Sequence, residues 1–276
     1  HDQPEDIYEI VRREAEKGIV LDNNPEFNIW GAGGCLSRAL VKRPVMTTPY
    51  GATLYGMRDQ IHEELKKQLD KGTVFPSIDS STDMWPHCKY LAFHIYDAIG
   101  RVVVSSRKGM KWLQDVAKAS NKLQRPIYWT LPTGFVVKQK YIRSIVKEIK
   151  TIINGRMASL YAGSSDADKM HTFRQVNGIA PNFVHSLDAC HLMKTIVSAR
   201  DNHGIESYAV VHDSFGTHAC DIEQLGIVLR ETFAEMYKED ILEKFMKEQG
   251  DLELPSLPEY GKLNIEDVKN AEFFFS

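Results

Sequence analysis

The residues with the clearest chemical potential lie in one short stretch, where His212 and Asp213 separate two apolar runs. Residues 208–211 favour a β-strand and residues 215–219 can form a second one, so the pair falls at a hairpin turn. A carboxylate held at a tight turn is rigid and open to solvent on one side. Oxygen ligands suit Mg²⁺, which keeps several waters that a phosphate can replace. The stretch predicts either a cation ligand at Asp213 or an Asp that only caps a turn.

A second candidate is the basic segment at residues 36–50, which is predicted to be helical. Arg38, Lys42, Met46 and Tyr50 recur every fourth residue and would share one helix face. The segment contains no acidic residue to offset its cations. An Arg and a Lys one turn apart can hold a triphosphate, and an aromatic ring at the far end can stack on a base. An ordinary basic surface helix is the alternative.

Composition and charge bear on whether the protein binds nucleic acid. The chain has 276 residues, 43% of them hydrophobic, and a net charge of −3, so the overall balance does not indicate a nucleic-acid binder. The distribution is more informative, because residues 138–156 hold six basic residues against one acid, whereas residues 221–276 hold fourteen acids against six bases. That division is compatible with one face built for a polyanion.

Cysteine usage and the chain start give two further expectations. The four cysteines form no CxxC pair, and the sequence has no signal peptide and no membrane-length apolar run. These features predict a reduced, soluble, intracellular protein. The chain opens at His1 without a methionine, which predicts a trimmed or processed piece.

Apolar periodicity predicts the elements that position these residues. The first expected helix covers residues 5–17, and Gly18 is expected to stop it. Turn residues between two β-favouring runs predict a hairpin over residues 128–137. Further helices are expected over residues 57–71, 84–101 and 107–122, after a cap at Asp221, and from Ile265.

The segment from residue 140 to residue 175 carries most of the basic cluster. Its alternating pattern, with Asn154 and Gly155 as the turn, predicts a long two-stranded β-ribbon. Such a ribbon fits the major groove of DNA, but a basic hairpin that meets only phosphates remains the alternative. A helix is expected to follow from Pro181 to Arg200, with His185 near its start.

Several of these segments, in this order, resemble motifs of the single-subunit polymerases, which include the bacteriophage and mitochondrial RNA polymerases and the family A DNA polymerases. They are an Arg and a Lys followed by Tyr50-Gly51, the stretch GIAPNFVHS at residues 178–186, and VHDSFGT at residues 211–217. The closing FFFS, residues 273–276, also resembles the carboxyl terminus of the phage and mitochondrial branch. That branch is the closer match, because family A DNA polymerases usually have an aromatic residue where Met46 stands and Glu where Ser214 stands.

The resemblance implies an α+β fold, with a mostly helical fingers subdomain and an antiparallel palm hairpin of the right-hand polymerase fold. It implies fingers over residues 1–139, a basic ribbon like the promoter specificity loop over 140–175, and the end of the fingers, the C-terminal palm and the tail over 176–276. The implied activity is DNA-directed RNA synthesis, a nucleotidyl transfer from NTPs to an RNA 3′-hydroxyl by a two-metal mechanism. The implied partners are a DNA template, the RNA product and NTPs, with no membrane.

The resemblance also implies roles for single residues. Arg38 and Lys42 would contact the nucleotide phosphates, and Tyr50 would stack near the insertion site and help to choose ribose. His185 would lie near the 2′-hydroxyl, and His212 would pack beside Asp213. Asp213 would be one of two carboxylates that hold a pair of Mg²⁺ ions.

The chain departs from the family pattern at one point. The motif that carries the first metal-binding Asp should precede residue 5, and it is missing here. The chain alone is therefore expected to be inactive, and the N-terminal remainder of the polymerase or a separate subunit would supply the second Asp. The expected compartment is the cytoplasm of a phage-infected or prophage-bearing bacterium, with the mitochondrial matrix as the alternative. A fragment of a family A DNA polymerase and a catalytically dead nucleic-acid-binding remnant are the alternative functions.

Overall fold

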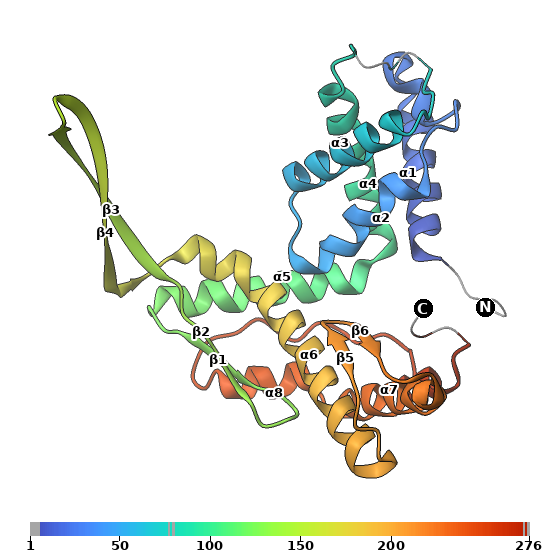
Figure 1. Ribbon diagram of the computed structural model, residues 1–276, viewed down its shortest axis with the longest axis vertical. Helices are drawn as coiled ribbons and strands as arrows, with labels where there is room; N and C mark the ends of the chain where they lie inside the picture. Colours follow the sequence, from blue (N-terminus) through green and yellow to red (C-terminus); the bar gives the residue numbers. More distant parts are fainter. Residues whose placement is uncertain (1–5, 77, 79–80, 273, 275–276) are drawn as a thin grey trace. The chain divides into compact units, whose positions relative to one another are not determined.

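The computed structural model describes residues 6–76, 78, 81–272 and 274. The chain divides into two compact units, with residues 1–110 and 259–261 in unit 1 and residues 111–258 and 262–276 in unit 2. The boundary falls within helix α5 (Val104–Lys122). Helices dominate, and the strands of the described residues form three two-stranded antiparallel sheets (Figure 1). This content confirms the predicted α+β class.

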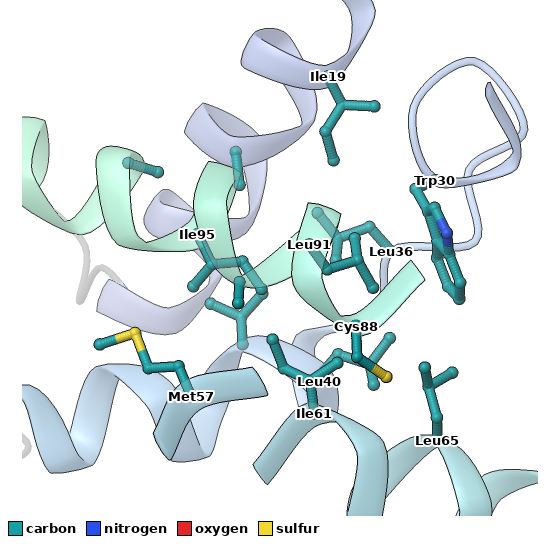
Figure 2. Packing of buried hydrophobic residues seen from close by; sticks show 14 of the residues in the cluster. Ile19, Trp30, Leu36, Leu40, Met57, Ile61, Leu65, Cys88, Leu91 and Ile95 are labelled. Atoms are coloured by element: carbon teal, nitrogen blue, oxygen red, sulfur yellow. The ribbon is translucent and has the colours of Figure 1, made fainter. Parts of the chain in front are cut away.

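Unit 1 is a helical body around one apolar core. Each helix contributes one apolar stripe, as in α1, where Val11, Ala15 and Ile19 recur every fourth residue and are buried. Figure 2 shows how side chains from the four main helices converge with Trp30. The elements are α1 (Ile7–Asp22), η1 (Pro25–Trp30), α2 (Arg38–Thr47), η2 (Thr48–Tyr50), α3 (Leu54–Asp70) and α4 (Trp85–Val102), with η for 3₁₀-helices.

The expected stop of the first helix at Gly18 is wrong. Helix α1 continues through Gly18 to Asp22 and ends at Asn23, whose φ of 48° is the left-handed conformation typical of a helix end. At Gly18 a Cβ would lie only 3.2 Å from Nδ1 of His94 on α4. The glycine therefore serves the close approach of α4 to α1 rather than the end of the helix.

Among the described residues, unit 2 combines three hairpins with the α-helices α6, α7 and α8, two 3₁₀-helices and the second part of α5. The β3–β4 ribbon extends away from the helices of its unit (Figure 1), and nearly all of its described side chains are exposed. The elements are β1 (Ile127–Thr130), β2 (Val136–Gln139), β3 (Ile142–Ile153), β4 (Arg156–Met170), α6 (Thr172–His203), β5 (Ala209–Val211), β6 (Ser214–Gly216), η3 (Ala219–Asp221), α7 (Ile222–Met236), α8 (Ile241–Glu248) and η4 (Ile265–Asn270).

An aromatic cluster joins α6, α8 and the β1–β2 hairpin. Phe245 of α8 lies 5.2 Å from Phe183 of α6 and 6.0 Å from Trp129 of β1, between ring centroids. Trp129 Nε1 donates a hydrogen bond of 2.9 Å to Ser186 Oγ on α6, so its one polar atom is satisfied. This cluster fixes α6 against the hairpin, and α6 carries one of the predicted site residues.

The expected start of α6 at Pro181 is also wrong. The helix begins at Thr172, and the His171 side chain caps it by accepting a hydrogen bond of 3.3 Å from Arg174 N. Pro181 lies in the helix interior, where its ring leaves the carbonyl of Asn177 without a helical partner. Asn177 is exposed, so water can satisfy that carbonyl. His185 consequently lies more than three turns into the helix.

In the described part of the chain, no helix combines the length and the apolar content that crossing a membrane requires.

Candidate active site

The predicted Asp213 turn is a two-residue β-hairpin. Val211 of β5 pairs with Ser214 of β6, so His212 and Asp213 form the turn between them. His212 has a φ of 54°, and a positive φ at the first central residue is what tight hairpin turns require. Both turn side chains are exposed. The hairpin expected from the sequence is confirmed, and it presents the Asp213 carboxylate to solvent from a fixed turn.

Contacts behind the turn hold the hairpin against α6 and α7. Phe215 of β6 packs on a buried apolar cluster, and its ring centroid lies 5.9 Å from that of His191 on α6. His191 Nε2 lies 2.9 Å from the Leu229 carbonyl, which can only accept, so Nε2 carries the proton and donates it. Burial lowers the pKa of His191, which favours a neutral ring at this contact. The cluster consists of Ala199, Ile205, Leu225, Val228 and Leu229.

The carboxyl-terminal tail meets the same cluster. Phe274 packs against it, and the Phe274 ring centroid lies 5.0 Å from that of Phe233 on α7. The other two aromatic residues of the closing FFFS stretch, Phe273 and Phe275, lie outside the described residues. Phe274 and Phe215 therefore share one apolar support, and Phe215 follows Asp213 by two residues.

A second carboxylate lies near the turn, on α6. Burial raises the pKa of Asp188, and the negative charge of Asp213 raises it further. The side chains of His185 and His212 act in the opposite direction on the same pKa. The three predicted site residues of unit 2 therefore lie within electrostatic range of Asp188.

Sequence reasoning missed Asp188. It follows His185 by three residues, and in a helix that spacing places both side chains on the same face. The spacing alone does not mark Asp188 as a site residue, because its closeness to Asp213 depends on the packing of the hairpin beside this part of α6. His185 itself is exposed on the helix.

The predicted phosphate-binding residues lie on α2 and η2 in unit 1. Arg38, Lys42 and Met46 are spaced by four on α2 and are exposed, as expected. The expectation that Tyr50 continues this stripe on the same helix is wrong. Helix α2 ends at Thr47, and the chain tightens into the 3₁₀-helix η2, which has fewer residues per turn. Tyr50 is 37% exposed at the end of η2.

Charge partners distinguish the two predicted cations. Arg38 forms an ion pair with Asp6, and its guanidinium lies 4.8 Å from the centroid of the Tyr8 ring. The side-chain hydrogen bond between Arg38 and Asp6 raises the pKa of Arg38 and lowers the pKa of Asp6. Lys42 forms no ion pair with any residue that the structure describes. A phosphate that bound Arg38 would compete with Asp6, whereas Lys42 is open to an anion.

The predicted site residues thus fall into two groups. Arg38, Lys42 and Tyr50 belong to unit 1, whereas His185, His212 and Asp213 belong to unit 2. Within unit 2 the shared electrostatic influence on Asp188 connects the members of the second group.

The basic ribbon forms as predicted, over a shorter range. Strand β3 pairs with β4 from Ile142 to Met170, and Asn154 and Gly155 form the turn with φ values of 51° and 75°. Two positive φ angles are typical of the type I′ hairpin turn that Asn-Gly favours. Along β3 the side chains alternate, so Arg143 and Lys147 share one face, and the register places Arg156 on that face too. This face carries most of the positive charge of the ribbon.

The donor chemistry of unit 2 suits a hard cation at Asp213. An exposed carboxylate on a fixed turn offers oxygen ligands, which Mg²⁺ prefers. Among the described residues, no group of three or more His, Cys, Asp and Glu side chains could hold a metal ion. The metal role of Asp213 therefore stays a prediction from the sequence.

Comparison with known proteins decides the family. The model of the DNA-dependent RNA polymerase family matches residues 1–251. The chain belongs to this family. It is of the single-subunit, phage-type branch, as the motifs around Lys42, His185 and Asp213 suggested. A fragment of a family A DNA polymerase, the alternative expected from the shared motifs, is not favoured by this match.

Curated relatives agree with the family and extend well beyond this chain. The chain is 35% identical to the mitochondrial DNA-directed RNA polymerase 1B of Nicotiana tabacum over all of its length, which is 27% of that protein. It is 37% identical to the chloroplastic DNA-directed RNA polymerase 3B of Nicotiana tabacum over 87% of the chain. A mitochondrial polymerase of Arabidopsis thaliana is 36% identical over 87% of the chain. The chain spans about a quarter of the length of these relatives.

The expected bacterial compartment is wrong. The relatives named above are mitochondrial and chloroplastic polymerases, which point to organelles and not to the cytoplasm of a phage-infected or prophage-bearing bacterium. The motifs alone did not separate phage from organellar members, because the chemistry of nucleotide addition is the same in both.

Proposed function

We propose that this chain is the C-terminal part of an organellar DNA-directed RNA polymerase, in which it carries the nucleotide-binding helix and one metal-binding carboxylate. The reaction is the template-directed transfer of a nucleotidyl group from an NTP to the RNA 3′-hydroxyl. The observation that carries the proposal is the exposed Asp213 in a two-residue hairpin turn, in a chain that belongs to the DNA-dependent RNA polymerase family. The mitochondrial and chloroplastic names of the relatives favour an organelle as its compartment.

In this proposal α2 binds the triphosphate. Lys42, exposed and without an ion pair among the described residues, supplies a point charge to the phosphate oxygens. Arg38 exchanges the Asp6 carboxylate for a phosphate and adds a planar fork of donors. Tyr50, at the end of η2, stacks near the nucleotide and helps to select ribose.

The carboxylate of Asp213 holds Mg²⁺, and His212 and His185 flank the nucleotide. Two Mg²⁺ ions supply activation of the 3′-hydroxyl and stabilisation of the leaving pyrophosphate when they are bound. Asp213 contributes one ligand, and a second carboxylate comes from a part of the polymerase outside this chain. His212 packs beside the carboxylate and keeps the tight turn, while His185 lies near the 2′-hydroxyl. The 276 residues alone are therefore inactive.

The proposed partners follow from this chemistry. DNA template, RNA product and NTPs bind the complete polymerase, and the basic face of the β3–β4 ribbon meets DNA. The three cations Arg143, Lys147 and Arg156 on one face of the ribbon support this contact, because phosphate neutralisation supplies most non-specific DNA affinity. Fingers over residues 1–139, the ribbon over 140–175 and the palm with its tail over 176–276 are the proposed domains.

The test is Asp213→Asn in the full-length polymerase that contains this chain. The variant keeps the size of the side chain but loses the charge that binds the cation, so RNA extension on a primed scaffold should fall by at least about a hundredfold. Asp221→Asn is the matched control, since Asp221 makes no side-chain cap and lies eight residues away. Template affinity, measured by fluorescence anisotropy, should be unchanged in both variants. Normal extension by Asp213→Asn would overturn the metal role.

A further inference from the structure

A buried polar network ties the foot of the ribbon to α6. Gln139 Nε2 donates to the Gln175 carbonyl at 2.9 Å, and Gln175 Nε2 donates back to the Gln139 carbonyl at 3.3 Å. Gln175 Oε1 also accepts a hydrogen bond of 3.2 Å from Tyr141 N. Gln139 is 3% exposed and Gln175 is 0% exposed. Buried amides bonded at both ends hold one geometry, because a shift would leave polar groups unpaired away from water.

The Tyr141 side chain is fixed by two further residues of α6. Asn182 Nδ2 donates to Tyr141 Oη at 3.0 Å and to Gln139 Oε1 at 2.8 Å. A Cβ at Gly178 would lie 2.9 Å from a ring carbon of Tyr141, so the ring rests directly on the helix backbone. We call Gln139, Tyr141, Gln175, Gly178 and Asn182 the ribbon clamp.

The ribbon clamp lies on the helix face that leads to His185. Gln175, Gly178 and Asn182 are separated by three and four residues on α6, and His185 follows Asn182 by three. Residues with this spacing share one helix face. On the other side of the contact, β3 begins directly after Tyr141. One rigid helix therefore carries both the attachment of the ribbon and His185.

A small movement at this attachment becomes large at the ribbon tip. Strand β3 has 12 residues, which corresponds to a length of about 40 Å. A swing of about 5° at the foot moves the tip by about 3.5 Å, which equals about one base-pair step of DNA. The base of the other strand is held separately. Met170 N, at the end of β4, donates a hydrogen bond of 2.8 Å to Gln124 Oε1.

We propose that the ribbon clamp is a positioning device, which keeps duplex DNA on the ribbon in fixed register with the nucleotide site at His185. The inference rests on the proposed function, because it assigns the ribbon to DNA and His185 to the nucleotide. Tyr141 and Asn182 are positioning residues that act through the ribbon and touch no nucleotide. Loosening the clamp therefore impairs the choice of a start site and leaves nucleotide addition intact.

The activity test compares two templates in the full-length polymerase that contains this chain. Asn182→Ala removes two hydrogen bonds of the clamp, and we expect RNA synthesis from a duplex start site to fall about tenfold. Extension of an RNA primer on a preassembled scaffold, which needs no ribbon contact, should stay within about twofold. Asn177→Ala is the matched control, because Asn177 is exposed on the same helix. Equal losses on both templates, or no loss on either, would overturn the inference.

A size exchange tests the contact itself. Gly178→Ala pushes the Tyr141 ring off the helix, and we expect the same selective loss at the duplex start site. Tyr141→Leu in the Gly178→Ala background makes room for the new methyl group and should restore at least part of the lost synthesis. Gly226→Ala on α7 is the control, because a Cβ there meets no atom within 4 Å. Absence of any restoration in the double variant would count against the packing of Tyr141 as the cause.

A distance measurement separates the inference from the proposed function. Spin-label amino acids encoded at Lys150 and Ala189, which are both exposed, report the ribbon tip against α6 by pulsed electron resonance without using the native cysteines. We expect a narrow distance distribution that broadens in Asn182→Ala and Gly178→Ala. Unchanged widths would overturn the positioning role, even in an active polymerase. If the unsubstituted polymerase shows the narrow distribution and the two variants broaden it, but the unsubstituted polymerase itself does not extend the scaffold, the clamp is upheld and the proposed function is refuted.

Discussion

Replacing Trp30 with Phe should destabilise unit 1 by roughly 2–3 kcal/mol. Trp30 is fully buried, and its Nε1–H donates a hydrogen bond of 3.1 Å to His87 Nδ1 on α4. The Phe ring keeps most of the apolar contact but leaves Nδ1 of His87 without its donor. Losing this hydrogen bond costs about 1–2 kcal/mol for a half-buried acceptor. The missing atoms of the indole leave a small cavity that adds about 1 kcal/mol.

Hydrogen exchange measures this loss within unit 1. The intact chain is exchanged across a urea series, and mass spectrometry follows the peptides of α1, α3 and α4. The expected loss of roughly 2–3 kcal/mol in stability corresponds to a roughly 30- to 150-fold larger opening equilibrium constant of unit 1. Trp85→Phe is the matched control, because Trp85 is 43% exposed, and its replacement should cost less than about 1 kcal/mol. Equal effects of the two substitutions would refute the argument from burial.

The same contact predicts a change in pH dependence. Burial lowers the pKa of His87, so the unfolded chain binds this proton more readily than the folded chain. The stabilisation is therefore complete above the unfolded value of about 6.5 and is lost as the pH falls below it. The N–H of Trp30 also occupies the lone pair of Nδ1, so Trp30→Phe should let His87 accept a proton and flatten this acid dependence. Parallel losses in both proteins between about pH 7 and pH 5 would refute that step.

Two further predictions concern unit 2. Gly155→Ala places a side chain at a φ of 75° and should cost the ribbon turn about 1–2 kcal/mol, which limited proteolysis would detect as faster cleavage near the turn. Asn154 also has a positive φ, but it is not strained in this way, because Asn tolerates the left-handed conformation. His191, whose pKa is lowered by burial, should lower the protection factors of the α6 and α7 amides, corrected for the intrinsic exchange rate, as the pH falls below about 6.5. His191→Gln keeps a donor for the Leu229 carbonyl but cannot titrate, so it should remove that acid dependence; an unchanged dependence would exclude His191 as the source.

Local signals allowed the hairpins to be predicted with good accuracy. The Asn154-Gly155 turn, the hairpin from Ile127 to Gln139 and the turn at Asp213 each depend on residues a few positions apart. Positive φ angles at Asn154, Gly155 and His212 are the backbone features that such turns require. Their geometry is therefore largely encoded in the turn residues themselves.

Helix limits depended on contacts that no local pattern contains. Glycine is a residue type that often ends helices, but the close approach of His94 on α4 explains the glycine at position 18 better. At the end of α2 the opposite error occurred, because the four-residue spacing from Arg38 to Tyr50 suggested a continuous helix. The change to the tighter η2 moves Tyr50 off that stripe. Spacing alone does not report a change in the number of residues per turn.

The candidate site shows the same division between local and distant information. The chemical character of Asp213 and Lys42 was visible in the sequence, since each stands in a short and distinctive setting. Asp188 was not visible, because its closeness to Asp213 arises from the packing of the β5–β6 hairpin beside α6; burial and the charge of Asp213 raise the pKa of Asp188. A carboxylate on a helix acquires such a role only through a neighbour distant in sequence.

The start of α6 explains why the ribbon clamp escaped the sequence analysis. With Pro181 taken as the first helical residue, Gln175 fell at the end of the ribbon and Gly178 between the ribbon and the helix, so neither shared a helix face with Asn182. The observed start at Thr172 adds about two and a half turns to the helix and places Gln175, Gly178 and Asn182 on one face with His185. A proline in a helix interior is tolerated here because the carbonyl that it frees, on Asn177, is open to water. The exposed side of α6 thus tolerates the proline, while its buried side holds the ribbon, and both properties follow from one continuous helix.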